Sequence, residues 1–343
     1  MARKTVRNEI YSDEKWALVS KENKELLNEF IEYLQSTDKS PTTIYAYTDD
    51  IKICWIWNLE NNDNKFFVDF TKRDIMKYQS YMLNTMKLSS NRIRRLKATI
   101  SSLSNFIESM LDDVYNGFRN IVNKIPAPVK QAVREKTILS EEQVNQLLTY
   151  LVDNKKYQQA CVVALAACSG SRKSELLRFK VSYFVPENIM YGSIYKTPER
   201  IKTKGRSSKG KLIFRYVLVD RFQPYLDLWL KEREELGITN EELFVVKNGT
   251  TWQPAKVSTL DSWTELFTKV LETDIYFHSF RHHFTTYLSE SNIPADVIKS
   301  LVGWESVEMV SLYTDTEADE EFGKYFDADG IKQVEQKSIG DLK

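Results

Sequence analysis

Two neighbouring segments decide the interpretation of this chain: HSFRHHF at residues 278–284 and LVGWESVEMVSLY at residues 301–313. They carry four side chains that can act on a phosphate ester, namely His278, Arg281, Trp304 and Tyr313. The planar fork of an arginine can hold two phosphate oxygens. A histidine can donate a hydrogen bond or transfer a proton near neutral pH. A tryptophan offers a single N–H donor, and a tyrosine hydroxyl can become a covalent nucleophile if its phenolate is stabilised.

Taken singly, each of these residues has a more ordinary explanation. A histidine and an arginine three positions apart on a helix are more often a surface or packing pair than a site. A single tryptophan or tyrosine usually packs in a core. The order and spacing of the four residues, together with an arginine far upstream, favour a functional site.

The upstream arginine follows a hydrophobic run. Residues 160–168 (ACVVALAAC) predict a buried helix, and Gly170 is expected to end it. Ser171 can cap a following helix, which places Arg172 near its first turn. Helix N-termini attract anions, so an arginine there adds charge to a prepared phosphate site, and Glu175 can brace it. An ordinary capped helix with a surface arginine is the alternative.

A basic hairpin is predicted between these two regions. Residues 212–219 are rich in β-branched and aromatic side chains and predict a strand, and residues 205–210 predict the turn before it. From 196 to 215 there are eight Lys or Arg and one Glu. A hairpin of this charge can clamp phosphates; a solvated turn is the alternative.

Taken together, these elements resemble the tyrosine recombinases, the phage-integrase family of site-specific DNA recombinases. The matching positions, in order, are GSRKSEL at 170–176, a hairpin lysine, HSFR at 278–281, LVGW at 301–304, and a tyrosine nine residues later. The resemblance spans most of residues 139–326. Trp304 stands where histidine is commoner in the family, which keeps an N–H donor but removes a titratable group. Lys202 and Lys204 both lie in the hairpin, and either can be the family's lysine.

The resemblance implies a catalytic set and a mechanism. The set is Arg172, Glu175, Lys204, His278, Arg281, Trp304 and Tyr313. Tyr313 would attack a phosphodiester to give a 3′-phosphotyrosine and a free 5′-hydroxyl, and Lys204 would protonate that leaving oxygen. The link keeps the bond energy, so neither ATP nor metal is required. The implied partners are a double-stranded DNA recombination site, three further protomers in a homotetramer on two sites joined through a four-way junction, and in some systems an accessory DNA-bending protein.

The rest of the chain predicts a mainly α-helical protein with a small β-hairpin or sheet. Helices are expected to begin at Ser40-Pro41, at Thr71 with Asp74, at Ser89 and at Ser140. We expect a flexible arm at 1–22, a helical, SAM-like core-binding domain at 23–115, a linker at 116–138, a catalytic domain at 139–326 and a tail at 327–343. Basic side chains expected on DNA are Lys87, Arg92, Arg94, Arg95 and Lys97 in the first domain, and Lys202, Arg206 and Lys209 in the hairpin. A solvated helix face is the alternative for the first group.

Composition sets wider limits. A length of 343 residues suits two domains with cores of their own. Charge is balanced, with 48 basic and 48 acidic residues, so DNA binding must rest on local clusters. The three cysteines show no metal-binding spacing and suit a reducing cytoplasm. Neither a signal peptide nor a membrane-spanning run is evident. The acidic segment 317–343 carries Phe322, Tyr325 and Phe326. The resemblance implies that they dock on a neighbouring subunit; a merely local role is the alternative.

Other functions remain open at this stage. The same chemistry serves type IB topoisomerases and telomere-resolving enzymes, and a non-catalytic DNA-binding protein can keep the fold. A helical scaffold that never touches DNA is a third class.

Overall fold

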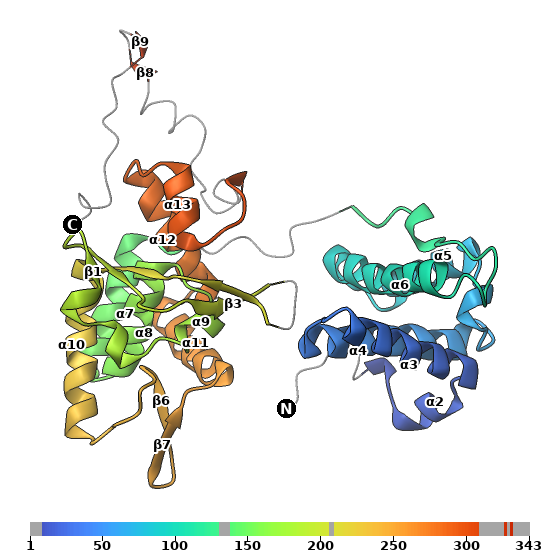
Figure 1. The fold of residues 1–343 in the computed structure, drawn as a ribbon, viewed down its shortest axis with the longest axis horizontal. Coiled ribbons are helices and arrows are strands. Elements are labelled where there is room, and N and C mark those ends of the chain that lie inside the picture. Colours follow the sequence, from blue (N-terminus) through green and yellow to red (C-terminus); the bar gives the residue numbers. More distant parts are fainter. Residues whose placement is uncertain (1–8, 130–137, 206–208, 309–325, 328–329, 332–343) are drawn as a thin grey trace. The chain divides into compact units, whose positions relative to one another are not determined.

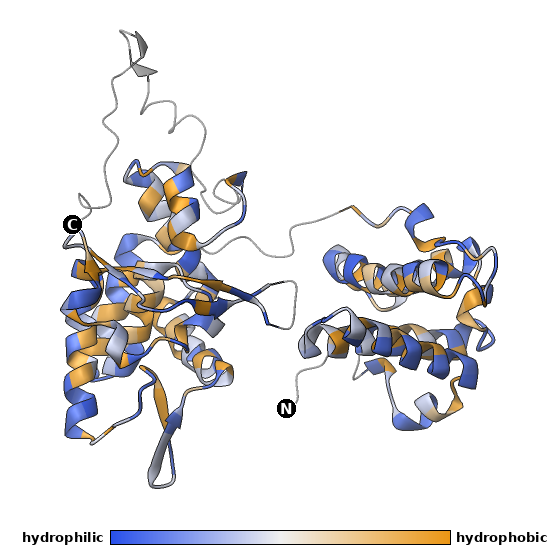
Figure 2. Ribbon diagram, in the orientation of Figure 1, coloured by the Kyte–Doolittle hydropathy of each residue, from blue (hydrophilic) through white to orange (hydrophobic). Residues whose placement is uncertain are grey.

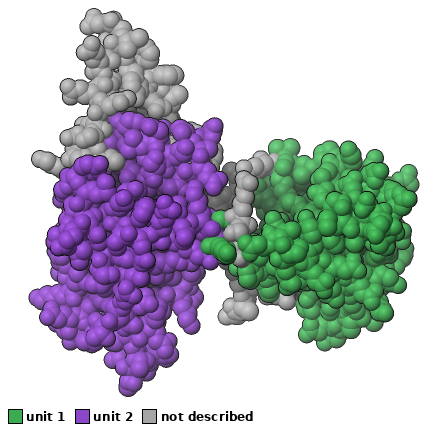
Figure 3. All heavy atoms as spheres, viewed as in Figure 1, with its two compact units in different colours: residues 1–135, 205–209 green, residues 136–204, 210–343 purple. Residues whose placement is uncertain are grey.

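The computed structural model describes residues 9–129, 138–205, 209–308, 326–327 and 330–331. The chain divides into two compact units (Figures 1 and 3). Unit 1 contains residues 1–135 with 205–209, and unit 2 contains residues 136–204 and 210–343. None of the described helices combines the length and the hydrophobicity that a membrane crossing requires.

Unit 1 is built from helices. They are α2 (Asp13–Leu18), α3 (Lys21–Ser36), α4 (Pro41–Asn61), α5 (Lys72–Ser80) and α6 (Ser90–Met110), with short turns η1 (Phe67–Asp69), η2 (Tyr81–Thr85) and η3 (Val122–Lys124). Serine side chains cap α2, α3, α4 and α6. Thr71 and Asp74 form the capping box expected from their spacing, at the start of α5. The predicted helix starts at Ser40-Pro41 and Ser89 are therefore found where the sequence places them.

The core of unit 1 is aromatic and includes part of the expected N-terminal arm. Trp55, Trp57 and Phe30 are almost fully buried. Trp16 of α2 stacks on Trp55 with ring centroids 6.3 Å apart, and Ile10 and Val19 are buried in the same core. Residues 9–22 therefore fold onto unit 1 rather than fraying as the sequence suggested, because their large hydrophobic side chains find a shared core. Residues 1–8, with Arg3, Lys4 and Arg7, lie outside the described residues.

The first half of the segment expected to be a linker is held against unit 1 instead. Val122 is buried against α6. Three side chains of α5 and α6 hold the backbone of the proline segment: Gln79 Nε2 donates to Pro126 O at 3.0 Å, Lys97 Nζ to Ile125 O at 2.7 Å and Arg94 Nε to Pro128 O at 2.8 Å. Residues 116–128 are thus anchored to unit 1, since proline extends the chain without preventing its carbonyls from accepting hydrogen bonds.

Unit 2 packs helices around α8. The helices are α7 (Glu141–Asp153), α8 (Tyr157–Ser169), α9 (Lys173–Leu176), α10 (Val219–Glu235), α11 (Val257–Leu271), α12 (Phe277–Glu290) and α13 (Ala295–Val302), with short turns η4 (Val181–Tyr183) and η5 (Pro186–Asn188). Every residue of α8 from Ala160 to Ser169 is buried, and α7, α10 and α12 all contact it. Hydrophobic residues fill positions 160–168, which make up most of this helix (Figure 2). A helix that is hydrophobic all round is expected at the centre of a domain.

Small antiparallel sheets complete unit 2. Strands β1 (Ile189–Met190), β2 (Ile194–Lys196) and β5 (Tyr216–Leu218) form one sheet, β3 (Ile201–Thr203) pairs with β4 (Lys211–Ile213), and β6 (Val245–Asn248) pairs with β7 (Thr251–Pro254). The β3–β4 pair is the expected basic hairpin. The single strand expected at 212–219 is instead two strands, because the chain leaves the hairpin after Ile213 and joins the other sheet at Tyr216. In the tail, β8 (Phe326–Asp327) pairs with β9 (Gly330–Ile331).

Candidate active site

Arg172 lies at the junction between α8 and α9. Gly170 ends α8 in the left-handed region, at φ 55°, and a Cβ there would come within 2.6 Å of the Phe284 ring. The sequence favoured Ser171 as the cap of the next helix, but Arg172 is the N-cap residue and Ser171 bonds with Ser169 instead. Helix α9 has only four residues, so the affinity of this junction for an anion must come from the guanidinium rather than from a helix terminus.

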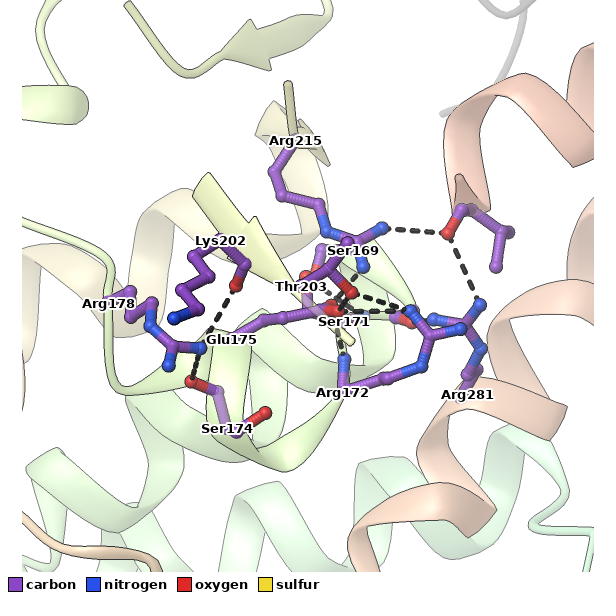
Figure 4. Close-up of polar contacts among 12 residues, drawn as sticks. Ser169, Ser171, Arg172, Ser174, Glu175, Arg178, Lys202, Thr203, Arg215 and Arg281 are labelled. Carbon is purple, nitrogen blue, oxygen red and sulfur yellow. Dashed lines mark hydrogen bonds and ion pairs between the residues drawn. The ribbon is translucent and has the colours of Figure 1, made fainter. Parts of the chain in front are cut away.

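Glu175 is the centre of the polar network beside Arg172 (Figure 4). Its carboxylate is fully buried and accepts hydrogen bonds from Arg172 Nη1 at 3.0 Å, from the Arg172 backbone N–H at 2.8 Å and from the Thr203 hydroxyl. It also forms an ion pair with the guanidinium of Arg215. Burial alone would raise the pKa of Glu175, but Arg215, Thr203 and Arg172 together hold that pKa below its ordinary value. Glu175 is therefore a charged anchor that orients Arg172.

Arg281 of α12 joins two other segments to this network. It is fully buried, and its Nη1 donates to Gly170 O at 2.7 Å while its Nη2 donates to Val302 O at 3.2 Å. Its guanidinium carbon lies 5.1 Å from the centre of the Trp304 ring, a cation–π contact. The end of α8, the first turns of α12 and the end of α13 thus meet at one arginine.

Gly303 and Trp304 follow the last turn of α13. Gly303 has φ 73° and caps the helix, and a Cβ on it would lie 2.6 Å from Ile213 Cδ1 of the hairpin. Trp304 is 6% exposed. The expected LVGW motif therefore lies between Arg281 and the hairpin. The close approach of Gly303 to Ile213 and its positive φ both favour glycine at this position.

His278 lies in the first turn of α12, one turn before Arg281. Its ring is edge-on to that of His282, with centroids 5.3 Å apart. Burial, with help from the neighbouring charges of His282, Arg281 and Arg172, lowers the pKa of His278 to about 4. The imidazole is therefore neutral at physiological pH, with one nitrogen that donates and one that accepts.

This pKa gives a prediction. A titration of the His278 ring followed by NMR is expected to show a midpoint near 4 in the protein alone. Binding of a DNA phosphate next to the ring should raise that midpoint, because a nearby negative charge stabilises the imidazolium. A His278→Gln variant identifies the resonance, since the chain has three histidines. A midpoint near the ordinary value of 6.5 without DNA would contradict the burial seen here.

The hairpin lysines remain two candidates. Lys202 lies in β3 and Lys204 follows it, and both are exposed, whereas Thr203 between them is buried against Glu175. Because neighbouring residues of a strand point to opposite faces, Lys202 lies on the face away from Glu175. Lys209, at the other end of the turn, is exposed. Tyr313 and Arg206 lie outside the described residues.

One buried residue of this network was missed by the sequence analysis. Arg215 was counted in the basic hairpin but given no role, yet it is fully buried and bonds both Glu175 and Val302 O. The only signal for it in the sequence was an arginine inside an otherwise β-branched and aromatic run, at the point where the strand divides. Among the described residues, no three His, Cys, Asp or Glu side chains gather into a group that could hold a metal ion. Chemistry without a metal ion stays a prediction.

The basic cluster of unit 1 divides into exposed and buried members. Arg94 and Arg95 are exposed, as is Lys87. Arg92 and Arg95 pair with the buried carboxylate of Asp50, at 2.8 and 3.4 Å. Lys97 differs from expectation, because it is only 6% exposed and its ammonium bonds Gln79 Oε1 and Ile125 O, both at 2.7 Å. It anchors the proline segment and is not placed to meet a phosphate.

These positions predict different effects on DNA binding. Arg95→Ala is expected to weaken binding to any duplex and to reduce the slope of log affinity against log salt by about one. Lys97→Met should lower the melting temperature and leave that slope unchanged, because its ammonium is bonded inside the protein. Filter binding at several salt concentrations measures the slope for each variant, and thermal melts measure the melting temperatures. Equal changes of slope in the two variants would contradict the assignment of Arg95 to a DNA contact and of Lys97 to contacts inside the protein.

Comparison with protein families places the chain. Residues 137–320 match the phage integrase family, and residues 26–116 match the N-terminal SAM-like domain of phage integrases. The chain belongs to the phage integrase family. The resemblance stated from the motifs, and the expected fold class, are thereby confirmed. Members of this family are the tyrosine recombinases, site-specific recombinases that cleave and rejoin DNA strands.

Curated relatives in the family cover most of the chain. The SPbeta prophage-derived recombinase-like protein YomM of Bacillus subtilis is 29% identical over 80% of this chain and 81% of its own. The tyrosine recombinase XerA of Pyrococcus horikoshii is 24% identical over 85% and 89%. The TnP I resolvase of Bacillus thuringiensis is 22% identical over 84% and 95%.

Solved structures of the family share the fold. The Tn1549 transposon integrase in complex with circular intermediate DNA superposes with a TM-score of 0.64 at 14% identity, covering 87% of this chain and 98% of that one. A lambda integrase dimer bound to a core site gives a TM-score of 0.63 at 17% identity, covering 91% and 99%. At these identities the match is one of fold.

Proposed function

We propose that this chain is an integrase-type site-specific DNA recombinase that cleaves and rejoins DNA through a 3′-phosphotyrosine at Tyr313. The observation that carries the proposal is the convergence of four side chains from separate segments of unit 2. Arg172, His278, Arg281 and Trp304 come from the α8–α9 junction, from α12 and from the end of α13, and they lie around one buried carboxylate network. An ordinary surface arginine would not need such a network.

Cleavage requires charge stabilisation more than covalent chemistry. The transition state of phosphoryl transfer spreads negative charge over the non-bridging oxygens, and preorganised donors carry most of the catalysis. The Arg172 side chain is 31% exposed and can reach a phosphate directly. Arg281 is enclosed, so its contact with phosphate requires the surrounding side chains to shift when DNA binds. Trp304 supplies an N–H donor and no proton transfer.

The proton transfers can be assigned to two residues. Tyr313 Oη attacks phosphorus and the bond to the 5′ oxygen breaks, so the phenol loses a proton and the leaving oxygen gains one. Neutral His278 has a nitrogen that can take the phenolic proton. Lys204, or Lys202 of β3, donates to the 5′ oxygen. In the reverse step the 5′-hydroxyl of the partner strand attacks the link, which exchanges strands through a four-way junction.

Unit 1 supplies the second contact with the duplex in this proposal. The exposed side chains of Lys87, Arg94 and Arg95, with Arg92 on Asp50, would hold the phosphate backbone. Lys202, Arg206 and Lys209 would add contacts from the hairpin. The core-binding domain would extend to near residue 128, beyond the end at 115 inferred from sequence, and the catalytic domain would begin at 139, as inferred from sequence. A homotetramer on two sites completes the assembly, with an accessory DNA-bending protein where the site requires one.

Tyr313→Phe tests the nucleophile. A plasmid with two copies of the site next to the coding region is incubated with protein and chelator, and recombinant circles are measured. The wild-type protein should recombine the plasmid, and Tyr313→Phe should not, because it lacks the attacking oxygen. The variant should still bind the site. Unchanged recombination by Tyr313→Phe would exclude Tyr313 as the nucleophile.

A second assay separates the alternatives. A supercoiled plasmid without the site is expected to stay supercoiled, because cleavage depends on site binding. Relaxation at the rate seen with the site would favour a topoisomerase. Specific binding with no cleavage of any substrate would favour a non-catalytic DNA-binding protein of the same fold.

A further inference from the structure

We propose that Arg215 is a positioning residue that ties the two active-site arginines together and sets the place of Trp304. This inference rests on the proposed function and extends it to a residue outside the expected catalytic set. Arg215 follows β4 and precedes β5, at the point where the chain leaves the basic hairpin. Its backbone is fixed there by two hydrogen bonds with Thr197, at 3.0 and 2.9 Å.

The guanidinium of Arg215 spans two functional segments. One end, Nη2, forms the buried ion pair with Glu175, the carboxylate that holds Arg172. The other end, Nη1, donates to Val302 O at 2.8 Å. Arg215 is fully buried, so both contacts are enclosed by the protein. The residue therefore links the Arg172 brace to the last turn of α13.

Val302 O is shared by two arginines. It accepts from Arg215 Nη1 and from Arg281 Nη2, and Figure 4 shows both bonds meeting at this carbonyl. An unbroken series of polar contacts thus runs from Arg172 through Glu175 and Arg215 to Val302 and Arg281. The two residues after Val302 are Gly303 and Trp304. A Cβ on Gly303 would lie 3.4 Å from Arg215 Nη1, so Arg215 also packs against the turn that presents Trp304.

Arginine is specifically suited to this place. Its planar fork donates in two directions at once, whereas a lysine has a single ammonium that cannot span both acceptors. The charges that face Glu175 are those of Arg172 and Arg215. Removing Arg215 should therefore raise the pKa of Glu175, because the charge of Arg215 is the strongest influence that opposes the effect of burial on this carboxylate. Protonated Glu175 would hold Arg172 less firmly. Because the pKa of Glu175 would be higher without Arg215, this weakening would begin at a higher pH.

The test compares two buried arginines of unit 2. Arg215→Met removes the fork, and Arg233→Met is the matched control. Arg233 is 4% exposed, donates to the backbone carbonyls of residues 240, 242 and 243, and lies over the ring of Trp229. Single-turnover cleavage at saturating DNA, duplex affinity and melting temperature are measured across a range of pH. We expect Arg215→Met to slow cleavage by about 10²-fold with affinity nearly unchanged, and to move the acid limb of the rate to higher pH. Arg233→Met should lower only the melting temperature.

Two further variants keep the inference testable. Arg215→Lys retains the buried charge, so it should keep the acid limb near its wild-type position yet cleave more slowly than wild type; it also serves if Arg215→Met does not fold. In a Glu175→Gln background, the loss caused by Arg215→Met should shrink, because both changes break the same series of contacts.

The outcomes separate this inference from the proposed function. If the wild-type protein cleaves and folded Arg215→Met or Arg215→Lys cleaves at the same rate with the same pH profile, the positioning role is wrong. It is equally wrong if Arg233→Met shows the same loss of rate and the same shift. If the wild-type protein forms no covalent complex with its site, the proposed function itself fails.

Discussion

Arg281→Ala is expected to slow formation of the covalent protein–DNA complex by about 10³-fold while duplex affinity falls by less than about tenfold. The guanidinium donates to Gly170 O and Val302 O and lies over Trp304, so its loss disturbs the two segments beside it and, in the proposed mechanism, removes a phosphate ligand. These interactions matter most when charge develops in the transition state. A single-turnover cleavage assay and a binding titration measure the two effects separately.

Arg281→Lys is the control for this variant. It keeps a positive charge but cannot donate to two separated carbonyls, so it is expected to recover part of the binding and little of the cleavage. Melting temperatures of both variants show how much of the change is loss of folding. Equal losses in affinity and in cleavage rate would contradict a role for Arg281 in the transition state.

Arg172→Ala is expected to cause a loss of cleavage of the same order, about 10³-fold. Arg172 has the accessible guanidinium of the pair, with 31% of its side chain exposed, and the buried carboxylate of Glu175 orients it. The network that holds Glu175 remains through Thr203 and Arg215, so the fold should change little. The assay is again single-turnover cleavage at saturating DNA.

Arg178→Ala is the matched control for Arg172→Ala. Arg178 is an exposed arginine of the same segment. Its guanidinium bonds Ser174 O at 2.8 Å and Lys202 O at 3.0 Å, and its backbone N–H bonds the backbone carbonyl of Glu175, not the carboxylate. We expect its cleavage rate to stay within about threefold of wild type, since surface substitutions away from a site usually have small effects. A loss as large as that of Arg172→Ala would show that general positive charge, and not the Glu175-braced fork, drives cleavage.

Local signals predicted the elements well. Ser40-Pro41, Thr71 with Asp74, and Ser140 each begin a helix, because caps satisfy backbone N–H groups within a few residues of sequence. The buried helix around residues 160–168 is also confirmed, since hydrophobicity on every face requires a central position. The motifs around Arg172, His278 and Arg281 could be found because each combines residue types with a fixed spacing.

Tertiary contacts were beyond the sequence. Arg215 bonds Val302, which is 87 positions away, and nothing near Arg215 in the chain announces that partner. Lys97 belongs to a run of basic residues, yet the carbonyl of Ile125 and the amide of Gln79 bury its ammonium. The break between β4 and β5 likewise depends on which strands they pair with, and hydrophobic alternation alone does not encode it.

The central claim is that Tyr313 becomes linked to DNA. A nicked suicide substrate that carries the site beside the coding region loses its cleaved fragment by diffusion, so the covalent complex accumulates. The protein is incubated with it in the presence of chelator, and the adduct is isolated on a denaturing gel and mapped by peptide mass spectrometry. We expect a 3′-phosphoryl link on Tyr313. An adduct on another residue, or specific binding with no adduct on any arrangement of the two sites, would contradict the account.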